Sequence, residues 1–486
     1  MKPTSHFLLL LGLVLMVTGC LPHERVWWSP DGSHAAVLLK DGLHVLKPGD
    51  TPGAPLVAGS SQSAELPGGV SWLPDGSGFV MVRSRTFPTW DLARVHIPAK
   101  EVEEVERLSL GVPGLVEALM ASGVAAKTSQ ELLQGSPLTK RGPQIAAFLY
   151  AYERKQQLID AMLKRSPAGQ ELIKQLQQEK IGQVVHEICV VDLKTVKPGG
   201  PEPRVLLRSL RDLTSPKVSS RHATVAFLRM MEEDESASLE VCALKGGEPT
   251  VLAQQVGLSF DWSPNGRSLV YTTAFSGTGS VMRRVHRVTA LDEKGEVASE
   301  ETRGTVENLA LAVMPSPNRV QNLPDGRVLI SALPLTLPMA GTEPEVESRL
   351  YIISVDGKTL TPVPTAPGGL PGDLGYFVVS PDGKRVAVAE GGSDAVAVVE
   401  LDSGKTTMVS PAHPNWQCRT LPAWKSATEL TFAALDGSPA APRWMIWSEE
   451  SGTRSLSASW SAEATAEWLE LKTNRESQPA AEAKTP

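Results

Sequence analysis

A tetrapeptide that recurs along the chain constrains this sequence more than any other feature. Four copies are nearly identical, and in a fifth Asn replaces Asp: Ser29–Gly32, Leu73–Gly76, Leu323–Gly326, Ser380–Gly383 and Ser263–Gly266. In x-Pro-Asp-Gly, proline presets φ at the second position, Asp suits the third and Gly closes the turn. Three copies directly follow a tryptophan, namely Trp28, Trp72 and Trp262. We therefore expect each copy to be a tight turn between two β-strands.

An apolar run after each turn predicts a second strand. The runs are His34–Leu39, Gly78–Val82, Ser268–Thr272, Val328–Ala332 and Val386–Ala389. Two weaker copies of the turn, Lys217–Ser220 and Lys425–Thr428, precede Arg221–Phe227 and Leu430–Ala434. The basic interval of about 45 residues is typical of β-propellers, whose blades have four antiparallel strands. The seven units predict an all-β, seven-bladed propeller over residues 27–472, with six or eight blades as the alternatives.

One interval is about 100 residues too long. The segments Cys189–Leu193, Glu240–Leu244 and Ala397–Leu401 have the same pattern and are expected to be third strands. The first of them belongs to the repeat that begins at Leu73, so residues 86–184 are predicted to be an insertion in blade two. Apolar residues within it recur at helical spacing, which predicts helices at 115–126, 145–163 and 166–181. These helices either pack on one another and on the propeller, or form a partner-binding or lid element.

These turns and strands resemble the TolB-like β-propeller family, in which a Trp-Ser-Pro-Asp-Gly turn joins the first two strands of each blade. The resemblance covers roughly residues 25 to 471 outside the insertion. It implies blades of four antiparallel strands around a central channel. TolB itself has six blades and a separate N-terminal domain, so its own role in the Tol–Pal envelope system is not part of the expectation.

The first twenty residues indicate a compartment. Lys2 is followed by an apolar run, Phe7–Thr18, which is shorter than the ~20 helical residues that span a bilayer. The run ends in Val17-Thr18-Gly19-Cys20, which resembles the lipobox of bacterial lipoproteins. This resemblance implies a signal peptide at 1–19, a lipidated Cys20, a tether at 20–26 and a place in the cell envelope, on the periplasmic face of the outer (or inner) membrane. An ordinary secretory signal is the alternative.

Composition excludes some classes of function and of scaffold. The net charge is −7 and there is no basic run, which argues against nucleic acid as a partner. Four cysteines are too few for a disulfide scaffold at this length. Because Cys189 and Cys242 are expected to face opposite sides of their strands, we predict buried free thiols. The tail at 473–486, rich in Ala, Glu, Pro and Ser, is predicted to be disordered.

The residue types that support catalysis form no recognisable constellation. Histidines and cysteines are not spaced as metal ligands, and no G-x-S-x-G nucleophile elbow occurs. The repeated aspartates Asp31, Asp75, Asp325 and Asp382 resemble candidate calcium ligands, but each belongs to its own turn and Asn265 replaces the fifth. The tryptophans Trp28, Trp72, Trp262 and Trp424 are interpreted as packing between blades. The sequence therefore predicts no catalytic residue, no metal site and no cofactor.

The leading hypothesis is a non-catalytic platform for envelope proteins, anchored to the membrane through Cys20. Loops between second and third strands are expected on the face opposite the Pro-Asp-Gly turns. Three irregular loops, Glu232–Glu235, Ser276–Gly279 and Pro334–Pro344, join the insertion there, and long loops on a rigid scaffold are where function concentrates. The alternatives are an enzyme of the hydrolase or lactonase type, or a glycan- or small-ligand-binding protein, using the central channel.

Overall fold

The structure is a computed structural model of the 486-residue chain. It describes residues 24–39, 41–58, 69–109, 146–147, 150, 183–231, 236–274, 282–314, 318–333, 349–364, 376–389, 395–410, 421–434 and 443–457. The signal peptide, Cys20, the tail at 473–486 and almost all of the helices predicted at 115–181 lie outside these residues, as do the three irregular loops.

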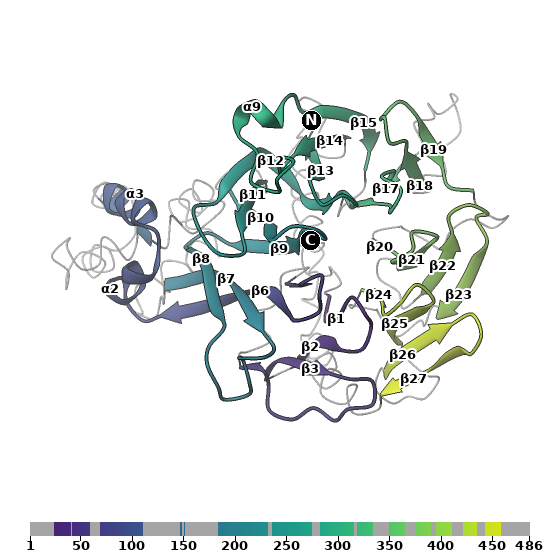
Figure 1. The fold of residues 1–486 in the computed structure, drawn as a ribbon, viewed down its shortest axis with the longest axis horizontal. Coiled ribbons are helices and arrows are strands. Elements are labelled where there is room, and N and C mark those ends of the chain that lie inside the picture. The colour runs from purple at the N-terminus through teal and green to yellow at the C-terminus, as the bar shows by residue number, and fades with distance from the viewer. Residues whose placement is uncertain are drawn as a thin grey trace, which may run out of the picture.

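The described strands form six antiparallel sheets arranged in a ring (Figure 1). Two four-stranded blades come first: β1 (Val26–Trp28), β2 (Ala35–Leu39), β3 (Gly42–Leu46) and β4 (Val57–Ala58), then β5 (Val70–Trp72), β6 (Gly78–Phe87), β7 (Gln183–Asp192) and β8 (Arg204–Ser209). A seven-stranded sheet follows: β9 (Leu213–Val218), β10 (Thr224–Met230), β11 (Ala237–Ala243), β12 (Thr250–Trp262), β13 (Ser268–Ala274), β14 (Met282–Thr289) and β15 (Glu307–Val313).

Three further four-stranded blades complete the ring. They are β16 (Val320–Asn322), β17 (Val328–Ala332), β18 (Arg349–Ile353) and β19 (Leu360–Pro362); β20 (Tyr376–Val379), β21 (Arg385–Ala389), β22 (Val396–Glu400) and β23 (Thr406–Ser410); and β24 (Ala423–Trp424), β25 (Glu429–Ala434), β26 (Arg443–Ser448) and β27 (Gly452–Ser457). Helices are short in the part of the chain that the structure describes: α2 (Trp90–Ala93), the 3-10 helix η2 (Arg94–His96), α3 (Ala99–Ser109) and α9 (Glu300–Arg303).

The all-β propeller is confirmed, but the count of seven blades is wrong, and so are the alternatives of six and eight. The described strands form five separate four-stranded blades, and the repeats expected from 217 and 263 share one seven-stranded sheet. The reason is β12, which is long enough to pair twice. Its first part pairs with β11 (Val251 with Glu240) and its last part with β13 (Trp262 with Leu269), so no turn separates the two repeats.

The predicted second and third strands are confirmed. The runs after the turns form β2, β6, β10, β13, β17, β21 and β25, and Cys189, Glu240 and Ala397 lie on β7, β11 and β22. Each turn glycine has a positive φ, and a Cβ on Gly32 would lie 2.5 Å from the Lys425 carbonyl oxygen. Only glycine suits that position. The weaker turn predicted from Lys217 begins two residues later, because the Ser219 amide donates to Thr224 as the Ser29 amide does to His34.

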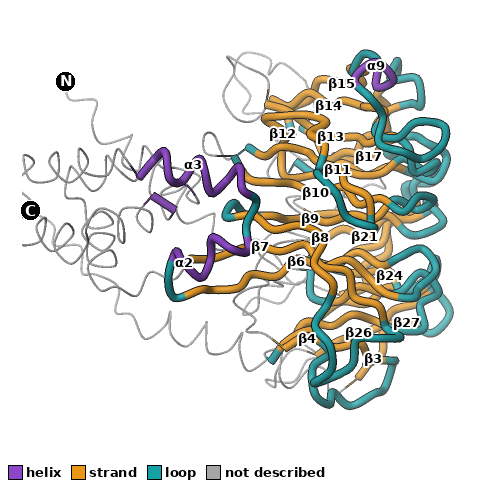
Figure 2. Tube along the Cα trace, turned by 60° about the vertical axis from the view of Figure 1, so that its left-hand side comes forward, coloured by secondary structure: helices purple, strands orange, loops and turns teal. Residues whose placement is uncertain are grey.

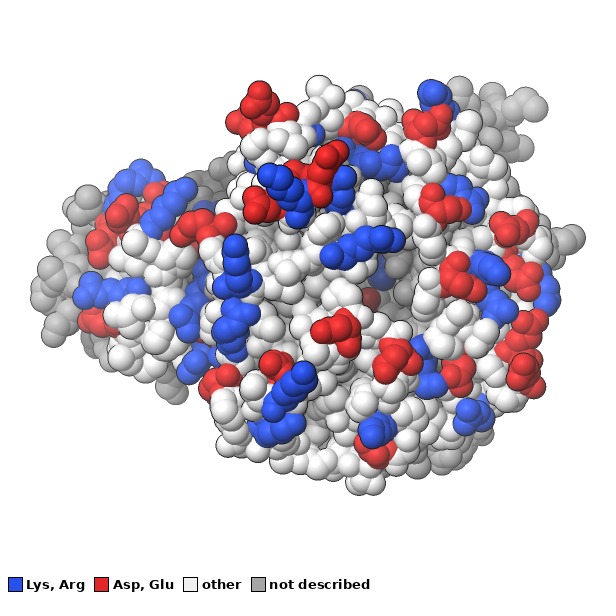
Figure 3. Space-filling view, in the orientation of Figure 1, with Lys and Arg blue, Asp and Glu red and all other residues white. Residues whose placement is uncertain are grey.

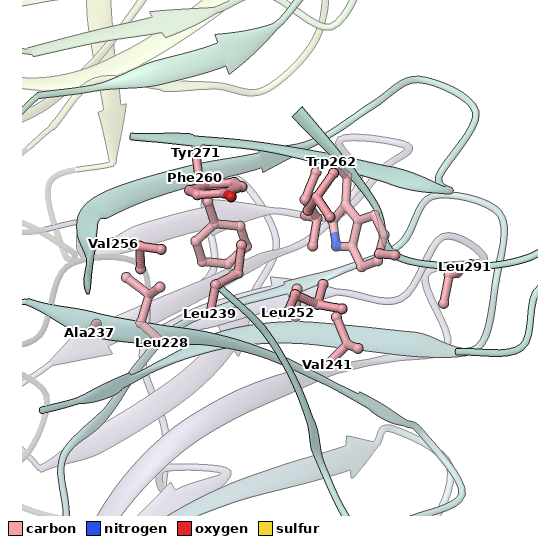
Figure 4. Packing of buried hydrophobic residues seen from close by; sticks show 14 residues of the cluster. Leu228, Ala237, Leu239, Val241, Leu252, Val256, Phe260, Trp262, Tyr271 and Leu291 are labelled. Atoms are coloured by element: carbon pink, nitrogen blue, oxygen red, sulfur yellow. The ribbon is translucent and has the colours of Figure 1, made fainter. Parts of the chain in front are cut away.

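Hydrophobic side chains fill the spaces between neighbouring sheets. One cluster joins the first two blades and includes Leu38 of the first with Phe79 of the second. Another joins the last two blades and includes Val398 and Phe432. Trp28 and Trp444 share a cluster between the first and last blades, which closes the ring. Within the seven-stranded sheet, side chains of β10–β14 pack against one another around Phe260 (Figure 4).

The ring has two different faces. The first strand of each blade runs towards the Pro-Asp-Gly turns, and we call that side the turn face. The opposite side is the insertion face, where β6 and β7 pair out to Phe87 and Gln183 and the chain leaves between them. Figure 2 shows α2 and α3 at one end of the strands and the turns at the other. The predicted domain boundaries, including 86–184 for the insertion, stay predictions.

Candidate functional site

The first strands line the central channel, and tryptophans link them around the ring. The indole N–H of Trp72 donates to the Trp27 carbonyl oxygen over 2.8 Å. The same bond joins Trp262 to Lys217 (2.8 Å) and Trp424 to Val378 (2.9 Å). In each pair the tryptophan directly precedes its turn, and the acceptor stands two residues before the preceding turn. The tryptophans therefore do pack between blades, and they also satisfy carbonyl groups at the channel wall.

Backbone amides of the channel wall find side-chain acceptors in the neighbouring unit. Ser71 accepts from the amide of Val218 (2.9 Å), and Gln321 accepts from that of Val379 (3.0 Å). Asp261 accepts from the amide of Asn322 (2.9 Å), while the Asn322 side chain donates to the Asp261 carbonyl oxygen (3.2 Å). Ser71, Asp261 and Gln321 each stand two residues before a turn. Their side chains stabilise the ring, because they accept hydrogen bonds from backbone amides at the strand edges that line the channel.

A cavity of about 540 Å³ occupies the channel. Its lining extends from turn residues such as Pro264, Pro324 and Pro381 to Glu24 near the other end. Figure 3 looks onto the turn face and shows a hollow near the centre of the ring. A volume of this size is typical of small-molecule sites.

Two charged residues of the cavity, Lys217 and Asp261, are paired with each other. Lys217 Nζ lies 3.0 Å from Asp261 Oδ1 and donates to the Phe260 carbonyl oxygen at 2.7 Å. Since the other oxygen of Asp261 accepts from Asn322, this carboxylate is engaged on both sides. The Asn322 Oδ1 atom is buried and has no hydrogen-bond partner. The cavity thus has a polar lining that includes one ion pair, while the amide oxygen of Asn322 is buried in its wall.

The insertion-face end of the channel contains a second polar contact. Glu24 accepts from the Trp27 indole over 2.8 Å and lies 3.5 Å from Arg319 Nη2. Burial raises the pKa of Tyr376, on which the charges of Arg319 and Glu24 also act. Glu24 and Arg319 precede β1 and β16, and Tyr376 begins β20. All three residues therefore lie at the start of first strands, at the end of the channel away from the turns.

Helix α3 of the insertion is bound to the ring by a buried carboxylate. Glu101 is 8% exposed, accepts from the Leu210 amide (2.8 Å) and pairs with Arg229 (3.0 Å). Arg229 also binds Glu240 on β11 through two hydrogen bonds of 2.9 and 3.0 Å. Tyr150 is buried, with the Arg211 guanidinium 4.6 Å from its ring centre. A charge-assisted network of this kind fixes one geometry, because breaking it leaves a buried charge unpaired.

A neighbouring ion-pair cluster lies on blade β5–β8. Glu187 is buried and accepts from Arg83 and Arg208, each over 2.7 Å, and Arg83 also pairs with Glu202. Burial by itself would raise the pKa of Glu187, but the hydrogen bonds from Arg208 and Arg83 hold it below the ordinary value. His186 on the same strand lies 2.6 Å from Asp212. These groups stabilise the part of the ring that supports α3.

The aspartates of the repeats are structural, as the sequence predicts. Asp31, Asp75, Asp325 and Asp382 each accept from the amide two residues further on, and Asn265 does the same. Hydrogen bonds from Ser29 and Ser33 lower the pKa of Asp31 to about 2. In the described part of the chain, no three His, Cys, Asp or Glu side chains form a group that could hold a metal ion.

The cysteines that the structure describes are buried and separate. Cys189 packs between the first two blades, and Cys242 packs on the other side of blade β5–β8. Both thiols are free. Cys20 and Cys418 lie outside the described residues, so lipidation of Cys20 stays a prediction. Among the helices described here, none is long and apolar enough to cross a membrane.

The sequence reasoning missed the anchor of α3. Glu101 and Val105 are the two buried residues of this helix and lie one turn apart. A glutamate on the apolar side of an amphipathic helix is a signal for a buried partner. That partner, Arg229, is 128 residues away and could not be identified from spacing. The pairing of Lys217 with Asp261 was missed for the same reason: Lys217 was assigned only to a weaker turn, and Asp261, 44 residues away, belongs to no motif.

Comparisons with known proteins give distant similarities in structure. No protein-family model matches the chain, and no curated protein matches its sequence. The chain is similar to TolB from Acinetobacter baumannii (16% identity, TM-score 0.35), over 55% of this chain and 57% of that one. It is also similar to an oligogalacturonate lyase from Vibrio parahaemolyticus (13%, TM-score 0.39, 75% and 73%). A third similar structure is the propeller domain of the Trilobed protease from Pyrococcus furiosus (12%, TM-score 0.37, 56% and 77%).

The match spans little more than half of the TolB chain. Because all three TM-scores are below 0.5, these similarities carry no conclusion about activity. The propeller architecture rests instead on the strand order and on the clusters between the sheets.

Proposed function

We propose that this protein is a non-catalytic interaction platform of the cell envelope, anchored through a lipid on Cys20, and that a partner protein docks on the insertion face. The observation on which the proposal rests is the buried bond network of Glu101. It holds α3 in one orientation on the ring through Leu210 and Arg229. A surface whose geometry is fixed before binding loses less entropy when it forms a complex.

The exposed side chains beside this anchor have the composition of a protein interface. Leu92 is 51% exposed and Val95 73% exposed, although both are apolar. Charged side chains adjoin them in the chain, and the exposed Arg94 forms an ion pair of 3.8 Å with Glu106 on α3. An apolar centre with a charged rim is the usual anatomy of a transient interface. We assign Leu92 and Val95 to the centre of the docking surface.

A small polar ligand in the central channel is the second candidate. The observation in its favour is the cavity of about 540 Å³, whose lining includes Ser71, Ser220 and Ser263. A glycan would suit this lining, because the hydroxyl groups of a sugar and of serine can both donate and accept hydrogen bonds. A hydrolase of the same channel would require a carboxylate or histidine that is available to act on substrate. Asp261 is engaged by Lys217 and Asn322, which favours binding over catalysis.

Photo-crosslinking in cells tests the docking surface. A photoreactive amino acid is placed at Val95 or, as the matched control, at Val355, which is 51% exposed in the β18–β19 turn on the turn face. We expect a discrete protein adduct from position 95 that Leu92→Glu abolishes, and none from position 355. Equal adducts from both positions, or none from position 95, would refute the assignment.

A further inference from the structure

The place where the chain enters the fold determines how far a lipid anchor can reach. Residues 21–23 alone separate Cys20 from Glu24. Glu24 is held by the Trp27 indole (2.8 Å) and by Arg319 (3.5 Å). The next carbonyl group, that of Arg25, accepts from the Leu38 amide at 2.9 Å. The chain is therefore fixed to the ring from Glu24 onward.

This fixed point lies at the insertion-face end of the channel. β1 runs from Val26 to the turn at Ser29, so residues before Val26 are on the side away from the turns. Arg319 directly precedes β16, which runs in the same direction towards its own turn at Leu323. Glu24 and Arg319 therefore both lie at the insertion-face end of the channel.

The remaining tether is too short to reach the other face. Four extended residues span roughly 14 Å. Glu24 and the turn residue Asp31 are seven residues apart along an extended strand, which corresponds to roughly 23 Å. A lipid on Cys20 therefore reaches a bilayer beside the insertion face, but not one beside the turn face.

We infer that the insertion face is turned towards the bilayer that holds Cys20, and that its docking partner is a protein of that same membrane with basic and apolar side chains close to the lipid surface. The inference rests on the proposed function, since it takes both the lipid on Cys20 and the docking surface from it. The cavity in the channel, whose lining includes turn residues, then faces the aqueous compartment.

Charge favours a protein over lipid as the occupant of this face. Apart from the buried Glu101, residues 88–109 contain four carboxylates and three basic side chains. Glu103 and Glu106 are exposed on α3, and the Glu106 side chain is 52% accessible. Anionic lipid attracts basic segments and repels acidic ones. Leu92 and Val95 thus belong to a segment whose exposed charges sum to about −1, which a basic protein segment complements and anionic lipid does not.

Energy transfer to lipid acceptors in reconstituted vesicles tests the orientation. Purified lipidated full-length protein carries Cys418→Ser and a single added cysteine, V95C or V355C, labelled with a donor dye. Cys189 and Cys242 are buried and are left in place. Position 95 should transfer at least twice as efficiently as position 355 to acceptor lipids in the outer leaflet. Equal transfer, or stronger transfer from position 355, would overturn the orientation.

A lengthened tether and a polarity probe complete the test. Twenty Gly/Ser residues inserted after Pro22 should reduce the difference in transfer efficiency between positions 95 and 355 by more than half. An unchanged difference would overturn the role of the tether. A polarity-sensitive dye at position 95 should stay in a water-like environment on anionic vesicles without protein. A blue shift would identify lipid, not protein, as the occupant. Failure to bind vesicles at all, or no adduct at position 95 in cells, instead marks failure of the proposed function.

Discussion

The Trp28 indole N–H donates to the Thr431 hydroxyl over 2.9 Å, although 403 residues separate them. The Thr431 hydroxyl in turn donates to the Ala423 carbonyl oxygen at 2.8 Å. Ala423 stands two residues before the turn at Lys425, where the other units place the acceptor of the tryptophan directly. In the other units the indole donates directly to a carbonyl oxygen. Between the last and first blades, the Thr431 hydroxyl stands between the indole and the carbonyl oxygen. This link joins two blades that share no strand.

Closure of the ring should depend on this pair. In a double-mutant cycle, Trp28→Phe and Thr431→Val should each destabilise the fold by about 1–3 kcal/mol. Thr431→Val leaves the buried indole N–H of Trp28 without an acceptor, and Trp28→Phe removes this hydrogen bond and part of a buried aromatic side chain. Their coupling energy should be about 0.5–1.5 kcal/mol. Urea denaturation measures all four free energies of unfolding. A coupling energy near zero would mean that the bond does not stabilise closure.

The contact of Glu101 that anchors α3 should be detectable as slow hydrogen exchange at the Leu210 amide. Glu101→Ala removes the acceptor of the Leu210 N–H and should speed hydrogen exchange at Leu210 by tenfold or more. Glu101→Gln keeps an acceptor oxygen and should show a smaller effect. Glu103→Ala, on the exposed side of the same helix, is the control and should leave the exchange rate unchanged. Protection of Leu210 that survives Glu101→Ala would contradict the anchoring role.

The two buried thiols should be inert in the native protein. Burial raises the pKa of Cys189 to about 12 and that of Cys242 to about 11, so the reactive thiolate is scarce at pH 8. In a Cys418→Ser background, a thiol reagent should modify neither residue until denaturant is added, and then both. Rapid modification of either thiol without denaturant would show that the blades open there.

Acid should weaken the fold partly through Glu187. Its folded-state pKa lies below the ordinary value of 4.5, because Arg208 and Arg83 stabilise the carboxylate. The unfolded chain therefore binds a proton first as the pH falls. The stability from this group is complete above about pH 5.5 and is lost as the pH falls through the folded-state pKa. Glu187→Gln should flatten the acid side of the stability profile, and an unchanged slope would exclude this contribution.

The local parts of the fold could be predicted from the sequence, while the contacts between units could not. The turn chemistry of Pro-Asp-Gly and the apolar runs fix short segments, so strands such as Val328–Ala332 were correctly placed. The separation of blades depends on whether the chain turns between two strands. Around Gly257 no turn occurs, and β12 continues from one repeat into the next. Counting repeats therefore overestimated the number of separate blades.

In the candidate site, too, local structure could be predicted from the sequence and long-range contacts could not. The structural role of Asp31 follows from its place in a turn, and so does that of Asn265. The pairing of Glu101 with Arg229 requires the insertion to fold back on a sheet that comes more than 100 residues later. A single sequence contains no signal for that approach. The surface at Leu92 and Val95 likewise becomes apparent only when their exposure is known.

Replacement of residues 88–182 by an Asn-Gly turn tests the central claim most directly. Phe87 and Gln183 are paired neighbours, so a two-residue hairpin turn can join them. The anchored variant and the parent chain are compared by quantitative co-purification from cells, with Val355→Glu as the control. We predict a cooperatively unfolding propeller that has lost the proteins retained by the parent and by the control. A folded variant that retains the same proteins would contradict the insertion face as the docking surface.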